Sequence, residues 1–166
     1  MNRLAQVAAT VGGIGYLRPA PGTWGSLAAL PLAWAFHTLG SFPMMVIATV
    51  ATCLAGFWAT KVMTKSTQDH DPSEIVIDEV TGQFIALLPL SYATWAYGVE
   101  VLAMWPGWLS AFALFRLFDI SKPSLVGRAD RRGDAVGVML DDVIAGIFAA
   151  IGVLILAAVW HGALGL

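Results

Sequence analysis

Long apolar segments alternate with short polar ones along the whole chain, and this alternation predicts the architecture. The apolar segments cover residues 27–39, 44–60, 80–95, 108–118 and 143–160. A helix needs about 20 apolar residues to cross a bilayer. The pattern therefore predicts an all-α, polytopic membrane protein with four to five short transmembrane helices. The segment 27–39 is short for a complete crossing, and whether it spans stays open.

A helix and a loop are expected before the first apolar segment. Leu4, Val7, Ala8 and Val11 follow helical spacing, which predicts an interfacial helix within residues 1–17. The stretch 18–26 contains two prolines and two glycines and is expected to form a bent loop. In it, Thr23 and Ser26 are placed to cap the helix that follows.

Further along, polar loops are expected at residues 61–79 and 119–142. No linker or low-complexity tract divides the chain, so a single membrane domain over residues 1–166 is predicted.

Composition supports the membrane assignment and excludes other classes. Hydrophobic residues make up 58% of the chain and charged residues 12%, about half the charge of an ordinary soluble domain. The mean hydropathy is +0.74. No basic patch indicates nucleic-acid binding. The single cysteine, Cys53, excludes a disulfide framework and a thiolate metal site.

The charged residues are distributed unevenly between the two ends of the predicted helices. With five crossings, all nine lysines and arginines and ten of the eleven acids fall on one side of the membrane. Cations mark the cytoplasmic side, so the N-terminus is expected inside and the C-terminus outside. Solubility does not require such a concentration of acids, which favours a functional site at the cytoplasmic face.

Two pairs of adjacent acids, Asp78–Glu79 and Asp141–Asp142, stand at the edges of apolar segments. Like charges repel, and burial penalises the ionised form, so a divalent cation is the simplest way to stabilise them together. The alternative is that each pair only complements a helix N-terminus, worth under about 1 kcal/mol. Gly82 and Gly146 follow the two pairs and would allow close helix approach there.

Other charged groups surround these pairs. Asp71 precedes a proline that turns the chain toward Asp78, so it is a candidate ligand, although a solvated loop charge explains it equally well. Arg116 and Lys122 could bind a phosphate beside the acids; an ion pair between Arg116 and Asp119, three residues apart on a helix, is the alternative. The cations of residues 128–132 are expected to contact anionic lipid headgroups.

Four sequence blocks carry a family resemblance: PGTWGSLAALP (21–31), HDPSEIVIDEVTGQFIA (70–86), FRLFDISKP (115–123) and GVMLDDVIAG (137–146). Together and in this order they resemble phosphatidylglycerophosphatase A, a family of bacterial inner-membrane lipid phosphatases. The resemblance implies Mg²⁺-dependent hydrolysis of phosphatidylglycerophosphate to phosphatidylglycerol and phosphate. The partners expected are then the phospholipid substrate and the membrane, with no expectation for the oligomeric state.

Ten polar residues of the blocks have expected roles. Catalytic roles are expected for Asp78, Glu79, Asp119 and Asp142, phosphate binding for Thr23, Ser26, Arg116 and Lys122, and Mg²⁺ binding for Asp71, Asp78, Glu79, Asp141 and Asp142. Two alternatives stay open. One is a small cation-coupled transporter subunit, which would require charge deeper in the membrane. The other is a lipid headgroup phosphotransferase.

Overall fold

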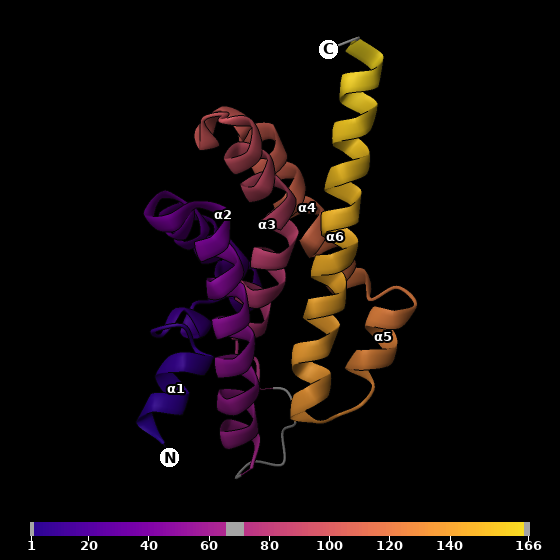
Figure 1. Cartoon of the computed structure of the whole chain (residues 1–166). Coiled ribbons are helices and arrows are strands. Elements are labelled where there is room, and N and C mark those ends of the chain that lie inside the picture. Colours follow the sequence, from indigo (N-terminus) through magenta and orange to yellow (C-terminus); the bar gives the residue numbers. More distant parts are fainter. Residues whose placement is uncertain (1, 66–71, 165–166) are drawn as a thin grey trace.

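The computed structural model describes residues 2–65 and 72–164, and every regular element in these residues is helical (Figure 1). The all-α prediction is therefore confirmed. The elements are α1 (Arg3–Ala9), η1 (Ile14–Tyr16), α2 (Pro21–Thr64), α3 (Ile77–Tyr97), η2 (Val101–Met104), α4 (Trp105–Ser121), α5 (Leu125–Asp130) and α6 (Ala135–Leu164).

Helix α2 is sharply kinked, because Gly40 and Ser41 leave the helical conformation, Ser41 with a φ of 56°. Its first turn lies against the start of α3, where a side chain at Gly22 would overlap Glu79. Its last turn lies there too, because Met63 packs in one cluster with Ile77. The helix thus folds back on itself, and the predicted segments 27–39 and 44–60 are its two legs.

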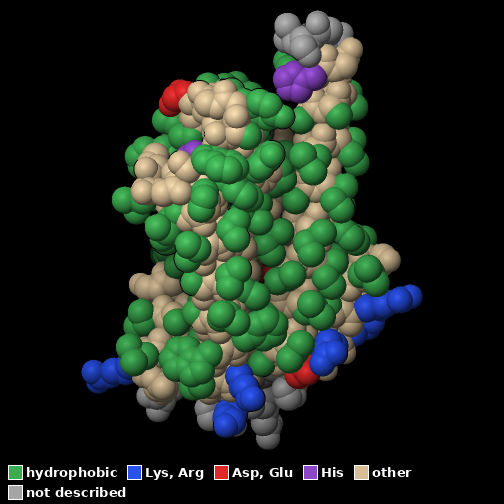
Figure 2. Space-filling view, in the orientation of Figure 1, with side chains coloured by type: hydrophobic (Ala, Val, Ile, Leu, Met, Phe, Trp, Pro, Cys, Tyr) green, Lys and Arg blue, Asp and Glu red, His purple; other side chains and the backbone are tan. Residues whose placement is uncertain are grey.

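Three helical stretches among the described residues are long and apolar enough to cross a membrane: 21–64, 101–121 and 135–162. The chain is accordingly a membrane protein with several spanning helices. Many large apolar side chains on these stretches are exposed, including Leu54, Leu109 and Leu154. Figure 2 shows apolar side chains over most of the visible surface and lysines and arginines gathered at one end.

Helix α3 is the central element and packs against α2, α4 and α6. Phe84 and Leu87 of α3 are completely buried and join Phe115 of α4 and Ala145 of α6 in the main core. This position fixes the first turn of α3 relative to the other helices, and the first turn carries the pair Asp78–Glu79.

Several boundaries differ from the sequence predictions. Helix α2 begins at Pro21, so Thr23 and Ser26 lie inside it rather than at its cap, and the prediction of capping is wrong. Proline is favoured in the first helical turn because its missing N–H has no partner there. The helix expected within residues 1–17 is shorter than predicted; α1 ends at Ala9, before the left-handed residues 11–13.

The expected polar loop 119–142 is also largely helical. It contains the end of α4, all of α5 and the start of α6. Helix α5 forms because Val126 and Ala129, one turn apart, are buried in the protein. Likewise, the stretch 61–79 is helical up to Thr64 and again from Ile77.

Candidate active site

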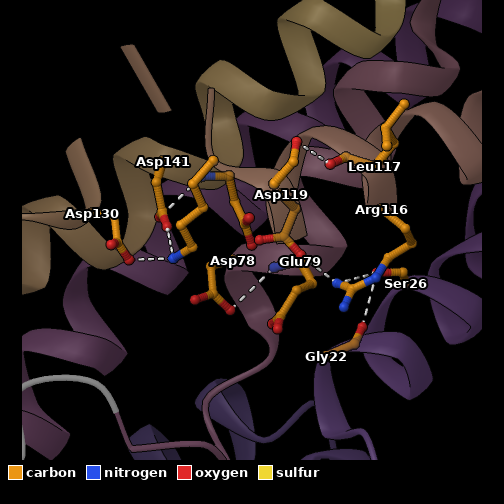
Figure 3. Close-up of polar contacts among 12 residues, drawn as sticks. Gly22, Ser26, Asp78, Glu79, Arg116, Leu117, Asp119, Asp130 and Asp141 are labelled. Carbon is orange, nitrogen blue, oxygen red and sulfur yellow. Dashed lines mark hydrogen bonds and ion pairs between the residues drawn. The ribbon is translucent and has the colours of Figure 1, made fainter. Parts of the chain in front are cut away.

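A cavity of about 260 Å³ contains both acidic pairs. It is lined by seven ionisable side chains from α3, α4, α6 and the residue after α4: Asp78, Glu79, Arg116, Asp119, Lys122, Asp141 and Asp142. Figure 3 shows the carboxylates of Asp78, Glu79, Asp119 and Asp141 directed toward a common space. Helices that are far apart in the sequence therefore supply one polar site.

The convergence depends on close contact between α3 and α6. A Cβ added to Gly146 would overlap the carbonyl oxygen of Gly82, and a Cβ added to Gly82 would stand 2.6 Å from the carbonyl oxygen of Asp142. Only glycine at both positions permits this approach. The expectation that these two glycines allow close approach of the helices is confirmed.

Within each acidic pair, the first carboxylate binds the backbone of the second residue. The Glu79 N–H donates to Asp78 Oδ1 at 3.1 Å, and the Asp142 N–H donates to Asp141 Oδ1 at 3.0 Å. Asp78, Asp141 and Asp142 are 6%, 6% and 3% exposed. These hydrogen bonds fix the two backbones and leave other carboxylate oxygens to face the cavity.

The carboxylates form two groups in which one oxygen from each residue lies within 4.8 Å of the others. The first group is Asp78, Glu79 and Asp142; the second is Asp119, Asp141 and Asp142. Asp142 Oδ1 and Glu79 Oε2 are buried and have no hydrogen-bond partner. Buried, unpartnered carboxylate oxygens in such groups fit a hard divalent cation, which takes oxygen ligands.

Two cations stand beside the acids. Arg116 Nη1 donates to Asp119 Oδ2 at 2.5 Å and to Ser26 Oγ at 3.5 Å, so the predicted intrahelical ion pair is present. Lys122 Nζ lies 3.0 Å from Asp141 Oδ2 and also pairs with Asp130. Lys122 follows the last residue of α4 in a left-handed conformation, which turns the chain toward α5.

Burial and neighbouring charges shift the pKa values of Glu79 and Lys122. Burial raises the pKa of Glu79, which precedes the apolar segment 80–95, to about 8. Burial alone would lower the pKa of Lys122, but its hydrogen bonds to Asp130 and Asp141 raise that pKa above its ordinary value. Lys122 therefore stays protonated, whereas Glu79 holds a proton near neutral pH unless a cation replaces it.

Not all of the predicted residues reach the cavity. Asp71 lies outside the described residues. Thr23 is half-buried but is not among the residues that line the cavity. Ser26 is buried and contacts Arg116 instead of lining the cavity, while its hydroxyl donates to the Gly22 carbonyl at 2.8 Å.

Sequence reasoning missed three residues around the site. Gly22 lets the start of α2 lie against the Glu79 carboxylate, and its position in the glycine- and proline-rich stretch was the available signal. Asp130, expected only in a headgroup-contacting loop, pairs with Lys122. Gln83, one turn after Glu79, is completely buried with neither amide atom partnered, and nothing in its sequence context distinguishes it.

One known protein family matches most of the chain. The family model for phosphatidylglycerophosphatase A matches residues 7–157. The chain belongs to the phosphatidylglycerophosphatase A family. The matched region contains all seven ionisable residues of the cavity. Membership of this family supports a lipid phosphatase role for the chain.

Three relatives are similar over most of their length. A Haemophilus influenzae protein named phosphatidylglycerophosphatase A is 37% identical over 84% of this chain and 80% of its own. The Escherichia coli protein of that name is 31% identical over 78% and 70%. A Bacteroides thetaiotaomicron protein named "Putative phosphatidylinositol-3-phosphatase" is 37% identical over 89% of both chains. No solved structure matches the chain.

Proposed function

We propose that the protein hydrolyses phosphatidylglycerophosphate to phosphatidylglycerol and inorganic phosphate in phospholipid biosynthesis, with Mg²⁺ as its cofactor. The observation that carries this proposal is the single cavity that combines five carboxylates with Arg116 and Lys122. Two relatives named phosphatidylglycerophosphatase A support the choice of substrate.

Carboxylates alone would repel a phosphate monoester, so a cation is needed. Asp78, Glu79, Asp141 and Asp142 would hold Mg²⁺, together with Asp71 from the preceding segment. Their oxygens are the ligand type that Mg²⁺ prefers, and the unpartnered oxygens of Glu79 and Asp142 fit this use. When bound, Mg²⁺ stabilises the negative charge on the phosphoryl oxygens.

The remaining residues bind the phosphate and handle the proton. Arg116 and Lys122 bind the phosphate oxygens through charge-assisted hydrogen bonds. Ser26 orients the Arg116 guanidinium, and Thr23 lies on the same turn of α2. Asp119 accepts a proton from the attacking water through the oxygen that does not bind Arg116. Water attacks phosphorus and the bond to the terminal glycerol oxygen breaks. That oxygen takes up a proton from bulk water and leaves as an alcohol, and Asp119 returns its proton to the solvent.

We place the protein in the bacterial inner membrane with the cavity toward the cytoplasm, the N-terminus inside and the C-terminus outside. The lysines and arginines at one end of the molecule support this orientation (Figure 2). The acyl chains of the substrate stay in the lipid while the headgroup enters the cavity.

Phosphate release tests the proposal. The purified protein is given phosphatidylglycerophosphate, phosphatidic acid or phosphatidylinositol-3-phosphate in mixed micelles, with Mg²⁺ or with a chelator. We expect Mg²⁺-dependent release that is fastest from phosphatidylglycerophosphate. Faster release from phosphatidylinositol-3-phosphate would overturn the substrate, and undiminished release in chelator would overturn the cofactor. Headgroup transfer without phosphate release would favour the phosphotransferase alternative.

A further inference from the structure

Asp142 belongs to both groups of cavity carboxylates. One of its oxygens lies within 4.8 Å of oxygens from Asp78 and Glu79, and it also completes a group with Asp119 and Asp141. Two oxygens on one Mg²⁺, each at about 2.1 Å from the ion, stand roughly 3 to 4 Å apart. Small side-chain movements would therefore close either group around an ion.

A second observation points to a ligand at the same residue. Asp142 is 3% exposed, and its Oδ1, buried in the protein, has no hydrogen-bond partner. An ionised carboxylate offers about four lone-pair positions on its two oxygens. Asp142 can therefore bind cations on both sides.

The charge of the cavity favours two ions over one. Its five carboxylates and two cations carry three formal negative charges in total. One divalent ion would leave the cavity negative, and two would make it positive. A phosphate monoester is an anion. Only with the second ion does the net charge of the cavity become positive and attract this anion.

The two groups differ in their present partners. Asp119 pairs with Arg116, and Asp141 pairs with Lys122. An ion bound by Asp119 and Asp141 has to displace these two cations. Among the described residues, neither Glu79 nor Asp142 forms an ion pair with a cation.

We propose that Asp142 is shared by two divalent-cation sites of unequal affinity. The tighter site includes Asp78 and Glu79, and the weaker one includes Asp119 and Asp141. Filling the weaker site releases Arg116 and Lys122, which then bind the substrate phosphate. This inference rests on the proposed function, because it assumes that the cavity binds divalent cations.

Titration of the full-length protein in detergent with Mn²⁺ alone, followed by electron paramagnetic resonance, tests the proposal. We expect two Mn²⁺ ions per chain and a spin-coupled signal at low temperature, because one carboxylate joins the ions. One ion per chain, or two uncoupled ions, would overturn the shared aspartate and leave the phosphatase proposal standing. Absence of bound Mn²⁺ would overturn both.

Variants separate the two sites. Lys122→Met should tighten the weaker site by about tenfold, because it removes a competing cation. The matched variant Arg128→Met alters an exposed cation outside the cavity and should change neither affinity. Asp141→Asn should keep one tight ion, and Asp142→Asn should lose the coupled signal. A coupled pair in Asp142→Asn, or an unchanged weaker site in Lys122→Met, would overturn the proposal.

Thermal unfolding of each metal-free variant checks its folding. If Asp142→Asn does not fold, Asp141→Asn and Lys122→Met decide the question, because each predicts a change at the weaker site only.

Discussion

The carbonyl oxygen of Gly82 on α3 occupies the space that a Cβ of Gly146 on α6 would need. This contact holds the two acid-bearing helices together, and neither glycine tolerates a side chain without movement of a backbone. The separation of α3 and α6 therefore sets the distance between the acidic pairs.

Gly146→Ala should force these helices apart, lower the free energy of unfolding by about 1–3 kcal/mol and reduce phosphatase activity. The matched control is Gly162→Ala, also on α6, where an added Cβ meets nothing within 4 Å. Thermal unfolding and phosphate release measure both effects. Equal stability of the two variants would show that the contact between α3 and α6 is not close.

Asp78→Asn and Asp142→Asn should each lower turnover by about a hundredfold or more, because the loss of a ligand charge weakens stabilisation of the phosphoryl oxygens by several kcal/mol. Both proteins should remain folded, since the change removes a repelling charge and keeps the side-chain shape. Glu100→Gln, an exposed acid beyond the far end of α3, is the control. Near-normal Mg²⁺-dependent activity in both variants would contradict the site assignment.

Arg116→Ala should raise the KM for the lipid phosphate by about tenfold or more, since a charge-assisted hydrogen bond is lost. The affinity of the Arg116→Ala variant for Mn²⁺ should not fall, because in the unmodified protein Arg116 competes with the ion for Asp119. Steady-state kinetics and Mn²⁺ titration separate the two effects. An unchanged KM would reduce Arg116 to the partner of a structural ion pair.

The raised pKa of Glu79 predicts a pH dependence of stability in the metal-free protein. The folded state holds a proton on Glu79 up to about pH 8, whereas in an unfolded chain the carboxyl has its ordinary pKa of 4.5. Between these values the folded state binds more protons, so Glu79 makes the free energy of unfolding fall by about 1.4 kcal/mol per pH unit.

Denaturant unfolding between pH 5 and pH 8 measures this slope, with Glu79→Gln as the comparison. Mg²⁺ should restore stability at pH 8, because it binds the ionised carboxylate. A slope that is the same in Glu79→Gln would assign the pH dependence to other groups.

The sequence was sufficient to predict the helical class, the membrane setting and the two acidic pairs. The length of an apolar segment and the adjacency of two acidic residues can both be read from a short stretch of sequence. Pairing of Arg116 with Asp119 also followed from helical spacing. The pairing of Lys122 with Asp130 did not follow from the sequence. It depends on residues 125–130 forming helix α5, and these residues were expected to belong to a polar loop. The burial of Gln83 and the closeness of Gly22 to Glu79 depend on packing between helices, which no single segment encodes.

The reversal of α2 at Gly40 and Ser41 has a consequence for membrane insertion. In the proposed topology, both ends of this 44-residue helix stay on the cytoplasmic side and only the bend is translocated. Residues 40–43 of the bend carry no charge, so the hairpin can enter the bilayer without moving an ion across it. Helix α2 can thus insert as one unit, and α3 can then pack against it.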